Sequence, residues 1–306
     1  MANWLGAAQR SLDLAQYDFN LGPETREVVA GALRGAAARG VAVRILYNVD
    51  HANPIPVPPP PEPDVELISA LGVPSRAIAG VPDLMHHKFV VRDGESLWTG
   101  STNWTDDSWS RQENVIVTAD SPELARAFTI DFEELWADGD VERSGFADAL
   151  THRIAKKIGH AQRVRICSPV ITSAPVLGTL AQAIADGRAD IAGCVDGTQV
   201  DEVVRQWRAD GNVAWKLPLL QRVLAGSFSG KRSEPWAVGS LHNFMHAKVI
   251  VADDVLFVGS FNLSHSGEKN AENVLEITDA GLAERLSAYV DEVRGRYPPA
   301  LSADPR

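Results

Sequence analysis

The stretch MHHKFVV, residues 85–91, places two histidines and a lysine at the start of an apolar run that is typical of a buried strand. Successive side chains of a strand point to opposite faces. His86 and Lys88 therefore share one face and can meet a common ligand, whereas His87 points to the other face. The alternation predicts that His86 and Lys88 act together and that His87 does not join them.

The same arrangement occurs a second time, about 160 residues later in the chain. The stretch MHAKVIV, residues 245–251, keeps His246 and Lys248 at the same spacing and carries Ala247 where the first copy has His87. If the two copies do the same work, that work does not require His87. Two matched strings of this kind also predict an internal duplication.

The duplication extends on both sides of the histidines. Each copy continues through three short strands into a helix, with Ser121 and Asp279 as the expected helix caps. A strand, helix and strand precede the motif at residues 11–19, 24–39 and 41–49, and again at 163–171, 176–185 and 189–195. These patterns predict an α/β protein of two similar lobes, residues 1–150 and 151–306.

Composition sets outer limits on the class of protein. The chain has 306 residues, of which 45% are hydrophobic and 23% charged, enough for two globular lobes with their own cores. No apolar run approaches the length of about 18 residues needed to span a bilayer, and the first residues lack a secretory profile. We therefore expect a cytoplasmic protein without a membrane span, with a secreted form trimmed of its leader as the alternative.

Cysteine content and net charge exclude further classes. Cys167 and Cys194 are too few and too far apart for a disulfide framework or a zinc ribbon, so two buried thiols are expected. The net charge of -11 argues against a protein that coats nucleic acid non-specifically. It leaves open a local basic cleft.

The repeated residues form one chemical set. Two imidazoles can serve as nucleophile and general acid at the same pH, and two ammonium groups supply positive charge for an anion. Serine and asparagine side chains add neutral donors. Such a set suits a phosphate oxyanion in the transition state. Its members are His86, Lys88, Ser101 and Asn103 in the first half, and His246, Lys248, Ser260 and Asn262 in the second.

Four acidic residues recur with this set. Glu113 and Glu272 stand in matching positions, as QEN and AEN, and are predicted to orient one histidine each. Solvated carboxylates at strand ends are the alternative. Asp93 and Asp253 also recur, five residues after each lysine, either as members of the catalytic set or as ordinary turn residues between strands.

The two strings resemble the paired HxK(x)4D…GSxN motifs of the phospholipase D superfamily. The resemblance implies a pseudo-twofold fold in which both motifs form one site at the lobe interface. It also implies a phosphohistidine intermediate and chemistry without metal or cofactor. By the family pattern His86 is the nucleophile and His246 protonates the leaving group, although chemical symmetry leaves the reverse assignment open. Lys88, Lys248, Asn103 and Asn262 would then clamp the phosphate, with Ser101 and Ser260 as supporting hydroxyls.

The subfamily follows from what the chain contains. Tyrosyl-DNA phosphodiesterases lack the motif aspartate, superfamily nucleases of bacteria commonly dimerise around one motif, and cardiolipin synthases usually carry N-terminal membrane spans. The expected protein is a monomeric enzyme similar to bacterial phospholipase D, acting on a phospholipid or related phosphodiester. A nuclease with the same chemistry and a non-catalytic phosphodiester-binding module are the alternatives.

Two insertions and a group of aromatic residues could shape the entrance. The proline-rich residues 53–63 are expected to form an extended connector. Residues 226–240 run into the second motif and could form a lip, with Lys231, Arg232 and Trp236 as contacts. Trp98 is expected in the core, while Trp104 and Trp109 could line the core or the rim. His242 stands four residues before His246 and is the one further histidine of interest.

Overall fold

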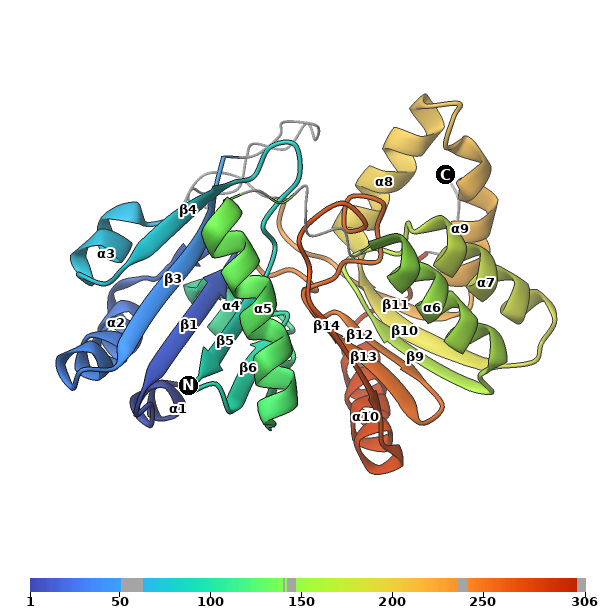
Figure 1. The fold of residues 1–306 in the computed structure, drawn as a ribbon. Coiled ribbons are helices and arrows are strands. Elements are labelled where there is room, and N and C mark those ends of the chain that lie inside the picture. The colour runs from blue at the N-terminus through green and yellow to red at the C-terminus, as the bar shows by residue number, and fades with distance from the viewer. Residues whose placement is uncertain (51–62, 140, 142–146, 236–241, 302–306) are drawn as a thin grey trace.

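The computed structural model describes residues 1–50, 63–139, 141, 147–235 and 242–301. Figure 1 shows two lobes side by side, each built on a mixed sheet with helices on its faces. The expected α/β class and the expected pair of similar lobes are both confirmed. The proline-rich segment 53–62 and Trp236 lie outside the described residues.

The first lobe is organised around a six-stranded sheet. Three of its strands run parallel, and the other three continue antiparallel from β1. In sheet order they are β4 (Ser75–Ala79), β3 (Ala42–Val49), β1 (Ser11–Gln16), β5 (Lys88–Arg92), β6 (Ser96–Gly100) and β8 (Ile116–Asp120).

The second lobe repeats this topology strand for strand. Three parallel strands are again followed by three antiparallel strands. In sheet order they are β11 (Ser227–Lys231), β10 (Asp190–Asp196), β9 (Arg163–Cys167), β12 (Val249–Ala252), β13 (Val255–Gly259) and β14 (Val274–Thr278). The strands that carry the two motifs, β5 and β12, therefore occupy the same place in the two sheets. A separate pair, β2 (Phe19–Asn20) and β7 (Trp104–Thr105), lies in the first lobe.

Helices cover the faces of both sheets. The first lobe has α1 (Ala2–Gly6), α2 (Pro23–Ala38), α3 (Val65–Ala70), α4 (Asp106–Ser110) and α5 (Pro122–Asp138). The second has α6 (Ala147–His160), α7 (Ala174–Ala185), α8 (Gly197–Ala209), the 3-10 helix η1 (Ala214–Lys216), α9 (Leu217–Leu224) and α10 (Ala280–Gly295). None of the helices in the described ranges is both long and apolar enough to cross a bilayer.

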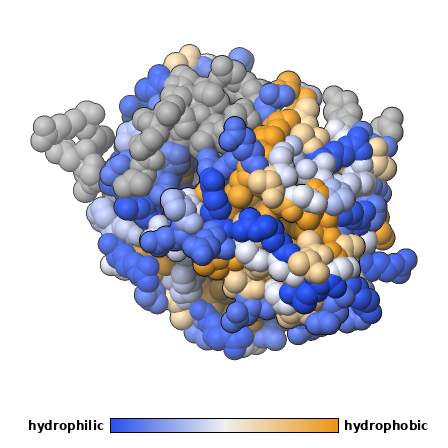
Figure 2. Space-filling model, turned by 90° about the vertical axis from the view of Figure 1, so that its left-hand side faces the viewer, coloured by the Kyte–Doolittle hydropathy of each residue, from blue (hydrophilic) through white to orange (hydrophobic). Residues whose placement is uncertain are grey.

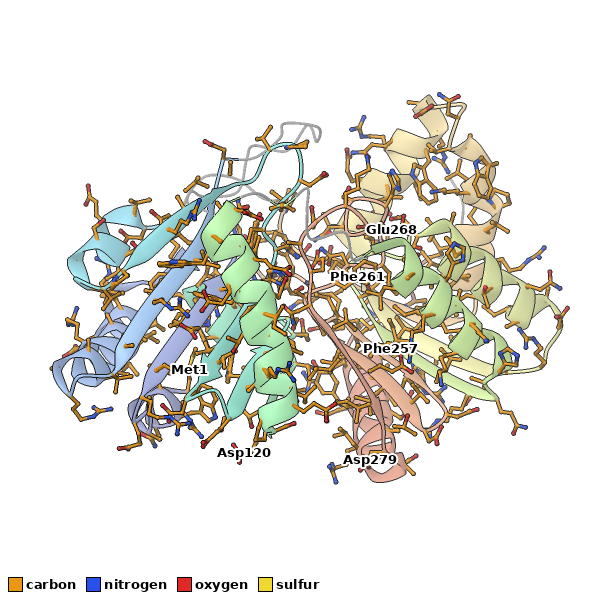
Figure 3. All side chains as sticks on the ribbon, in the orientation of Figure 1. Met1, Asp120, Phe257, Phe261, Glu268 and Asp279 are labelled. Carbon is orange, nitrogen blue, oxygen red and sulfur yellow. The ribbon has the colours of Figure 1, made fainter. Side chains whose placement is uncertain are left out.

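Helices α5 and α10 follow the last strand of each sheet and begin with the expected caps. The Ser121 hydroxyl accepts the Leu124 N–H at 3.3 Å, and the Asp279 carboxylate accepts the Leu282 N–H at 2.7 Å. Such caps satisfy amide groups that lack a partner within the helix. Figure 3 shows Asp120 and Asp279 at the same end of the two lobes, far from Glu268.

The apolar core has three parts. One lies on the outer side of each sheet, and the third joins the lobes. The joining cluster includes Phe89 and Phe132 of the first lobe and Val249 and Val290 of the second, all buried. Burial of one such side chain contributes about 1.5–3 kcal/mol, so this shared core holds the lobes together. On the outer face of the first lobe, Figure 2 shows hydrophilic and apolar residues intermixed.

The predicted division of the chain near residue 150 lies close to the start of helix α6. Position 150 falls inside α6, and Ile154 and Ile158 of that helix pack in the core of the second lobe. Helix α6 therefore belongs to the second lobe from its start.

Candidate active site

The two motif histidines lie where the lobes meet. Each precedes its strand and is held by the backbone of the opposite lobe: His86 N–H donates to Ala271 O at 2.9 Å, and His246 N–H donates to Glu113 O at 3.2 Å. Short parallel bridges accompany both contacts. The fold thus brings the two motifs to one interface, in the arrangement that the family resemblance implied.

Two buried polar residues fix the segments that lead into the histidines. Asn48 Oδ1 accepts the Met85 N–H at 2.9 Å, and Asp196 Oδ2 accepts the Met245 N–H at 3.0 Å. Sequence reasoning missed both residues. They lie at the carboxyl ends of the parallel strands β3 and β10, Asn48 one residue before the last and Asp196 as the last, and side chains at this edge of a sheet commonly line sites. Their position at the ends of these strands was the feature of the sequence that could have identified them as site residues.

The lysines are buried and bound to their own motifs. Lys88 Nζ donates to His86 O and Lys248 Nζ to His246 O, both at 2.8 Å. Burial lowers the pKa of Lys88 to about 7, although Glu272 and Asp18 partly oppose the shift. Burial and the nearby Lys88 charge lower the pKa of Lys248 well below its usual value. Burial and mutual repulsion thus disfavour the charged form of both lysines, and an anion bound beside them would stabilise it.

The same surroundings act on the imidazoles. Burial, followed by the charges of Lys88 and Lys248, lowers the pKa of His86 well below its usual value. Burial and the same two lysines do so for His246, with His86 as a further cause. Both rings therefore feel a single cluster of positive charge. A bound phosphodiester anion would offset that charge and make an imidazolium easier to form.

The partners of the two rings differ. His86 Nδ1 lies 2.7 Å from Glu272 Oε1, and burial raises the pKa of this carboxyl to about 7. His246 Nδ1 lies 3.0 Å from Asn114 Oδ1. Each partner comes from the opposite lobe, but one is a carboxylate and the other an amide. In both rings Nε2 is the nitrogen left for a substrate.

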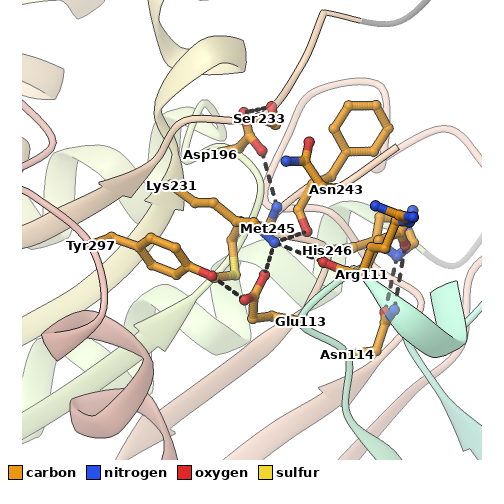
Figure 4. Close-up of polar contacts among 12 residues, drawn as sticks. Arg111, Glu113, Asn114, Asp196, Lys231, Ser233, Asn243, Met245, His246 and Tyr297 are labelled. Atoms are coloured by element: carbon orange, nitrogen blue, oxygen red, sulfur yellow. Dashed lines mark hydrogen bonds and ion pairs between the residues drawn. The ribbon is translucent and has the colours of Figure 1, made fainter. Parts of the chain in front are cut away.

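The structure corrects the orienting role expected of Glu113. Its carboxylate faces Lys231 and Tyr297, and Asn114 takes the place beside His246 (Figure 4). The reason is a difference of one residue in strand pairing between the two halves. Ser101 N–H pairs with Val115 O, whereas Ser260 N–H pairs with Asn273 O.

This shift makes Asn114 the structural counterpart of Glu272. A slip of one residue along a strand exchanges the faces of all its side chains. The matching letters QEN and AEN therefore align residues that point in different directions.

The serines and asparagines of the repeat have separate surroundings. Ser101 Oγ donates to Asn114 Oδ1 at 2.7 Å, and Ser260 Oγ donates to Glu272 Oε2. The two hydroxyls thus fix the residues that face the histidines. Buried polar atoms without a partner are uncommon and mark candidate ligand contacts. Among the described residues, the Oδ1 atoms of Asn103 and Asn262 are of this kind.

The structure also corrects the placement of Asp93 and Asp253 in the catalytic set. Asp93 lies in the turn between β5 and β6, at the far end of the strand from His86, and the five residues of β5 alone span about 16 Å at about 3.3 Å per residue. Its carboxylate accepts the backbone N–H groups of Gln9, Arg10 and Ser11 at 2.6–3.1 Å. Asp253 binds the start of β9 in the same way. Both have positive φ, which favours Asp over most residues.

Asp93→Ala is therefore expected to weaken the fold and leave the site unchanged. Loss of these hydrogen bonds together with a left-handed alanine should lower the free energy of unfolding by about 2–4 kcal/mol. Urea unfolding, with turnover measured in parallel under conditions where the variant is folded, checks this. A variant that unfolds like wild type but has lost turnover contradicts the structural role.

The remaining candidate side chains make contacts within the protein. His87 points away from the site, with Nε2 3.1 Å from Asp131 Oδ2 and its ring against Phe89. Trp98 and Trp104 are buried in the core, so Trp104 does not line a rim, and Trp109 is partly buried against the same core. The remaining candidates bind protein groups: His242 stacks on Phe244, Lys231 pairs with Glu113, and Arg232 pairs with Asp201.

Tyr17 is a further site residue that sequence reasoning missed. Its ring lies edge-on to His86 at 4.6 Å between centroids, and Lys88 Nζ is 4.7 Å from its centre. It directly follows strand β1, at the same sheet edge as Asn48. In the second lobe the residue that corresponds by strand register is Pro169. The site is therefore asymmetric in its aromatic contacts too.

A family model described as "Cardiolipin synthase, PLD-like domain" matches residues 1–136 and 154–294. The chain belongs to the phospholipase D superfamily. The two matched segments correspond to the two lobes, so the family resemblance and the fold that it implied are confirmed. In this phospholipase D-like chain, both motifs come from one polypeptide.

Curated relatives agree with this membership. The mitochondrial cardiolipin hydrolase of Homo sapiens is 33% identical over 131 residues, covering 42% of this chain and 47% of the relative. That of Chlamydomonas reinhardtii is 30% identical over 135 residues, covering 44% and 55%. The chain thus spans about half the length of the curated relatives that it matches.

In fold, the chain is similar to phosphatidylserine synthase of Haemophilus influenzae. The TM-score is 0.67 at 12% identity, over 96% of this chain and 82% of that one. A polyphosphate kinase from Porphyromonas gingivalis gives a TM-score of 0.59 at 14% identity, over 95% and 47%. At these identities the likeness concerns the fold alone.

Proposed function

We propose that the protein is a metal-independent phosphodiester hydrolase or transferase that acts through a phosphohistidine on His86. The observation that carries the proposal is the convergence of two buried histidine–lysine pairs from opposite lobes. They meet with a carboxylate at one ring and an amide at the other. Because one chain supplies both pairs, a monomer is sufficient.

The lysines and asparagines supply the electrostatic part of the reaction. A phosphodiester carries one negative charge, which moves onto the non-bridging oxygens and the leaving oxygen in the transition state. The ammonium groups of Lys88 and Lys248 lie beside the histidines, and Asn103 and Asn262 follow at the ends of β6 and β13. Fixed donors in a buried site stabilise such charge without reorganising.

The first chemical step forms a bond between phosphorus and nitrogen. His86 Nε2 attacks the phosphorus with its lone pair, the bond to the leaving oxygen breaks, and that oxygen takes a proton from His246 Nε2. In the second step His246 accepts a proton from water or an alcohol. The resulting oxygen nucleophile attacks the phosphorus, and the bond to His86 breaks.

The unequal partners of the rings support this division of labour. Glu272, beside His86, can balance the positive charge of a phosphorylated imidazole throughout the life of the intermediate. Asn114, beside His246, orients the ring without a charge, which leaves the imidazolium a stronger acid. The carboxylate thus favours His86 as the nucleophile, and the amide favours His246 as the proton carrier.

A phospholipid or a related phosphodiester is the proposed substrate class. The descriptions of the matched family and of the related proteins name cardiolipin. Cardiolipin and the simpler phospholipids are phosphodiesters. The site described above recognises the phosphodiester group itself. The groups on either side of it are the part that assay must identify.

Purified protein with EDTA present is expected to hydrolyse bis(p-nitrophenyl) phosphate and to release product from cardiolipin or phosphatidylcholine vesicles. Single- and double-stranded DNA should remain intact in parallel reactions. Cleavage of DNA without lipid turnover would show that the enzyme is a nuclease with the same chemistry and not a lipid phosphodiesterase. Absence of turnover with all of these phosphodiesters would overturn the catalytic proposal and favour a non-catalytic binding module.

Anion binding should weaken as pH rises through about 7. In that range Lys88 loses its proton, and the buried carboxyls of Asp18 and Glu272, each with a pKa raised to about 7 mainly by burial, lose theirs. All three changes make the site more negative, so sulfate affinity should fall by about tenfold or more per pH unit. Calorimetry from pH 6 to 8 at constant ionic strength tests this. A constant affinity would show that these groups do not face the anion.

A further inference from the structure

Lys231, at the end of β11, carries a buried charge that the proposed reaction does not use. Only 6% of the residue is exposed. Its Nζ lies 2.5 Å from Glu113 Oε2 and donates to Arg111 O at 2.9 Å and to Phe244 O at 3.5 Å. One ammonium group thus ties a loop of the first lobe to the second-lobe segment that leads into His246 (Figure 4).

Glu113 completes this tie from the other side. Tyr297, just after α10, donates its hydroxyl to Glu113 Oε1. Burial and this hydrogen bond raise the pKa of Tyr297, so the phenol keeps its proton and remains a donor. With both carboxylate oxygens engaged, the Glu113 side chain is fixed, and its backbone carbonyl accepts the His246 N–H. The next residue, Asn114, contacts the ring of His246.

The other half of the protein has apolar residues in place of this ion pair. Strand register places Ile78 where the second lobe has Lys231, because Ile78 pairs with Asn48 and Lys231 pairs with Asp196. Ala271 takes the place of Glu113, since its carbonyl accepts the His86 N–H. The fold itself therefore accepts a neutral pair at these positions.

The two histidines need different support. His86 lies beside a carboxylate and the Tyr17 ring, whereas His246 has the Asn114 amide in place of the carboxylate and a proline at the position that corresponds to Tyr17. We propose that Lys231 and Glu113 are positioning residues for His246. They hold the backbone on both sides of its ring so that Nε2 faces the leaving oxygen. The inference rests on the proposed function.

Leaving-group dependence separates positioning of the acid from general damage. Bis(p-nitrophenyl) phosphate releases an anion that needs little protonation, whereas diphenyl phosphate releases a more basic phenolate that needs the acid. Lys231→Met should lose at least about tenfold more turnover on diphenyl phosphate than on the nitrophenyl ester, as His246→Ala should. Equal losses on both esters would reduce Lys231 to a structural residue.

A second variant removes both charges at once, so that neither Lys231 nor Glu113 is left as a buried charge without its partner. The double change Lys231→Ile with Glu113→Ala installs the pair that the other half carries, so it should fold and unfold thermally close to wild type. It should show the same leaving-group dependence as Lys231→Met. Lys157→Met serves as the control, because Lys157 is an exposed partner of Glu276 at 3.7 Å, and should match wild type on both esters.

Nitrogen NMR of the histidine rings keeps this test independent of turnover. In the double variant the ring signals of His246 should change while those of His86 stay, and unchanged His246 signals would overturn the positioning role. If wild-type protein hydrolyses neither ester, the proposed function fails, and the NMR comparison still decides whether Lys231 and Glu113 position the ring. The two failures are therefore distinguishable.

Discussion

His86→Ala is expected to lower turnover of bis(p-nitrophenyl) phosphate by at least about 10⁴-fold, since loss of a covalent nucleophile removes the whole two-step route. The His86 ring makes an edge contact with Tyr17 and lies against Glu272, and neither contact holds the sheets together. The variant should therefore keep its fold. Steady-state kinetics, with circular dichroism as a check on folding, measures the effect.

His265→Ala is the matched control for this variant. His265 also lies close to a glutamate, with Nδ1 3.2 Å from Glu268 Oε2, but its side chain is 71% exposed and outside the motifs. It should retain wild-type turnover. Turnover of His86→Ala within tenfold of wild type would remove His86 from the role of nucleophile.

Glu272→Gln is expected to lower kcat by about 10²-fold or more with little change in KM. The substitution keeps the shape and the acceptor that face His86 Nδ1 but removes the charge that balances a phosphorylated ring. Ser260 and Asn270 can still contact the amide. Rapid-quench kinetics should place the loss in formation and lifetime of the intermediate.

Asn114→Asp makes the complementary change at the other ring. A carboxylate beside His246 Nδ1 should raise the pKa of that ring and slow departure of poor leaving groups. Substrates with good leaving groups should be less affected. If Glu272→Gln and Asn114→Asp gave the same pattern on both kinds of substrate, the rings would not divide the reaction as proposed.

Much of the site could be predicted because it depends on local spacing. Strand alternation placed His86 and Lys88 together and put His87 on the other face, and the structure confirms this. The repeat predicted two matching lobes because each copy carried the same run of strands and the same capped helix. These patterns involve residues that are close in the sequence, so they can be recognised without knowledge of the fold.

The errors arose where a contact depends on register between distant segments. Glu113 and Glu272 match in the sequence, but a shift of one residue between β6 and β8 relative to β13 and β14 turns Glu113 toward Lys231. Asn48, Asp196 and Tyr17 escaped notice because their importance comes from sheet order. Only the folded sheets bring those strand ends beside the histidines.

The duplicated fold thus carries an unequal site. The two halves share strand order, lysines and serines, but they differ in Glu272 against Asn114 and in the ion pair of Lys231 with Glu113 against Ile78 with Ala271. In a reaction with one nucleophile and one proton carrier, equal halves would leave the roles of the histidines interchangeable. In the proposed function, these differences give one role to each histidine.

The most direct test is to trap the covalent intermediate. Removal of His246 should slow the second step more than the first when the leaving group is p-nitrophenolate, so His246→Ala should accumulate the adduct. The reaction is quenched at alkaline pH and digested, and the peptides are examined by mass spectrometry. The account predicts a nitrophenylphosphoryl group on the peptide that contains His86. Continued turnover with no adduct on that peptide, or an adduct on another residue, would contradict it.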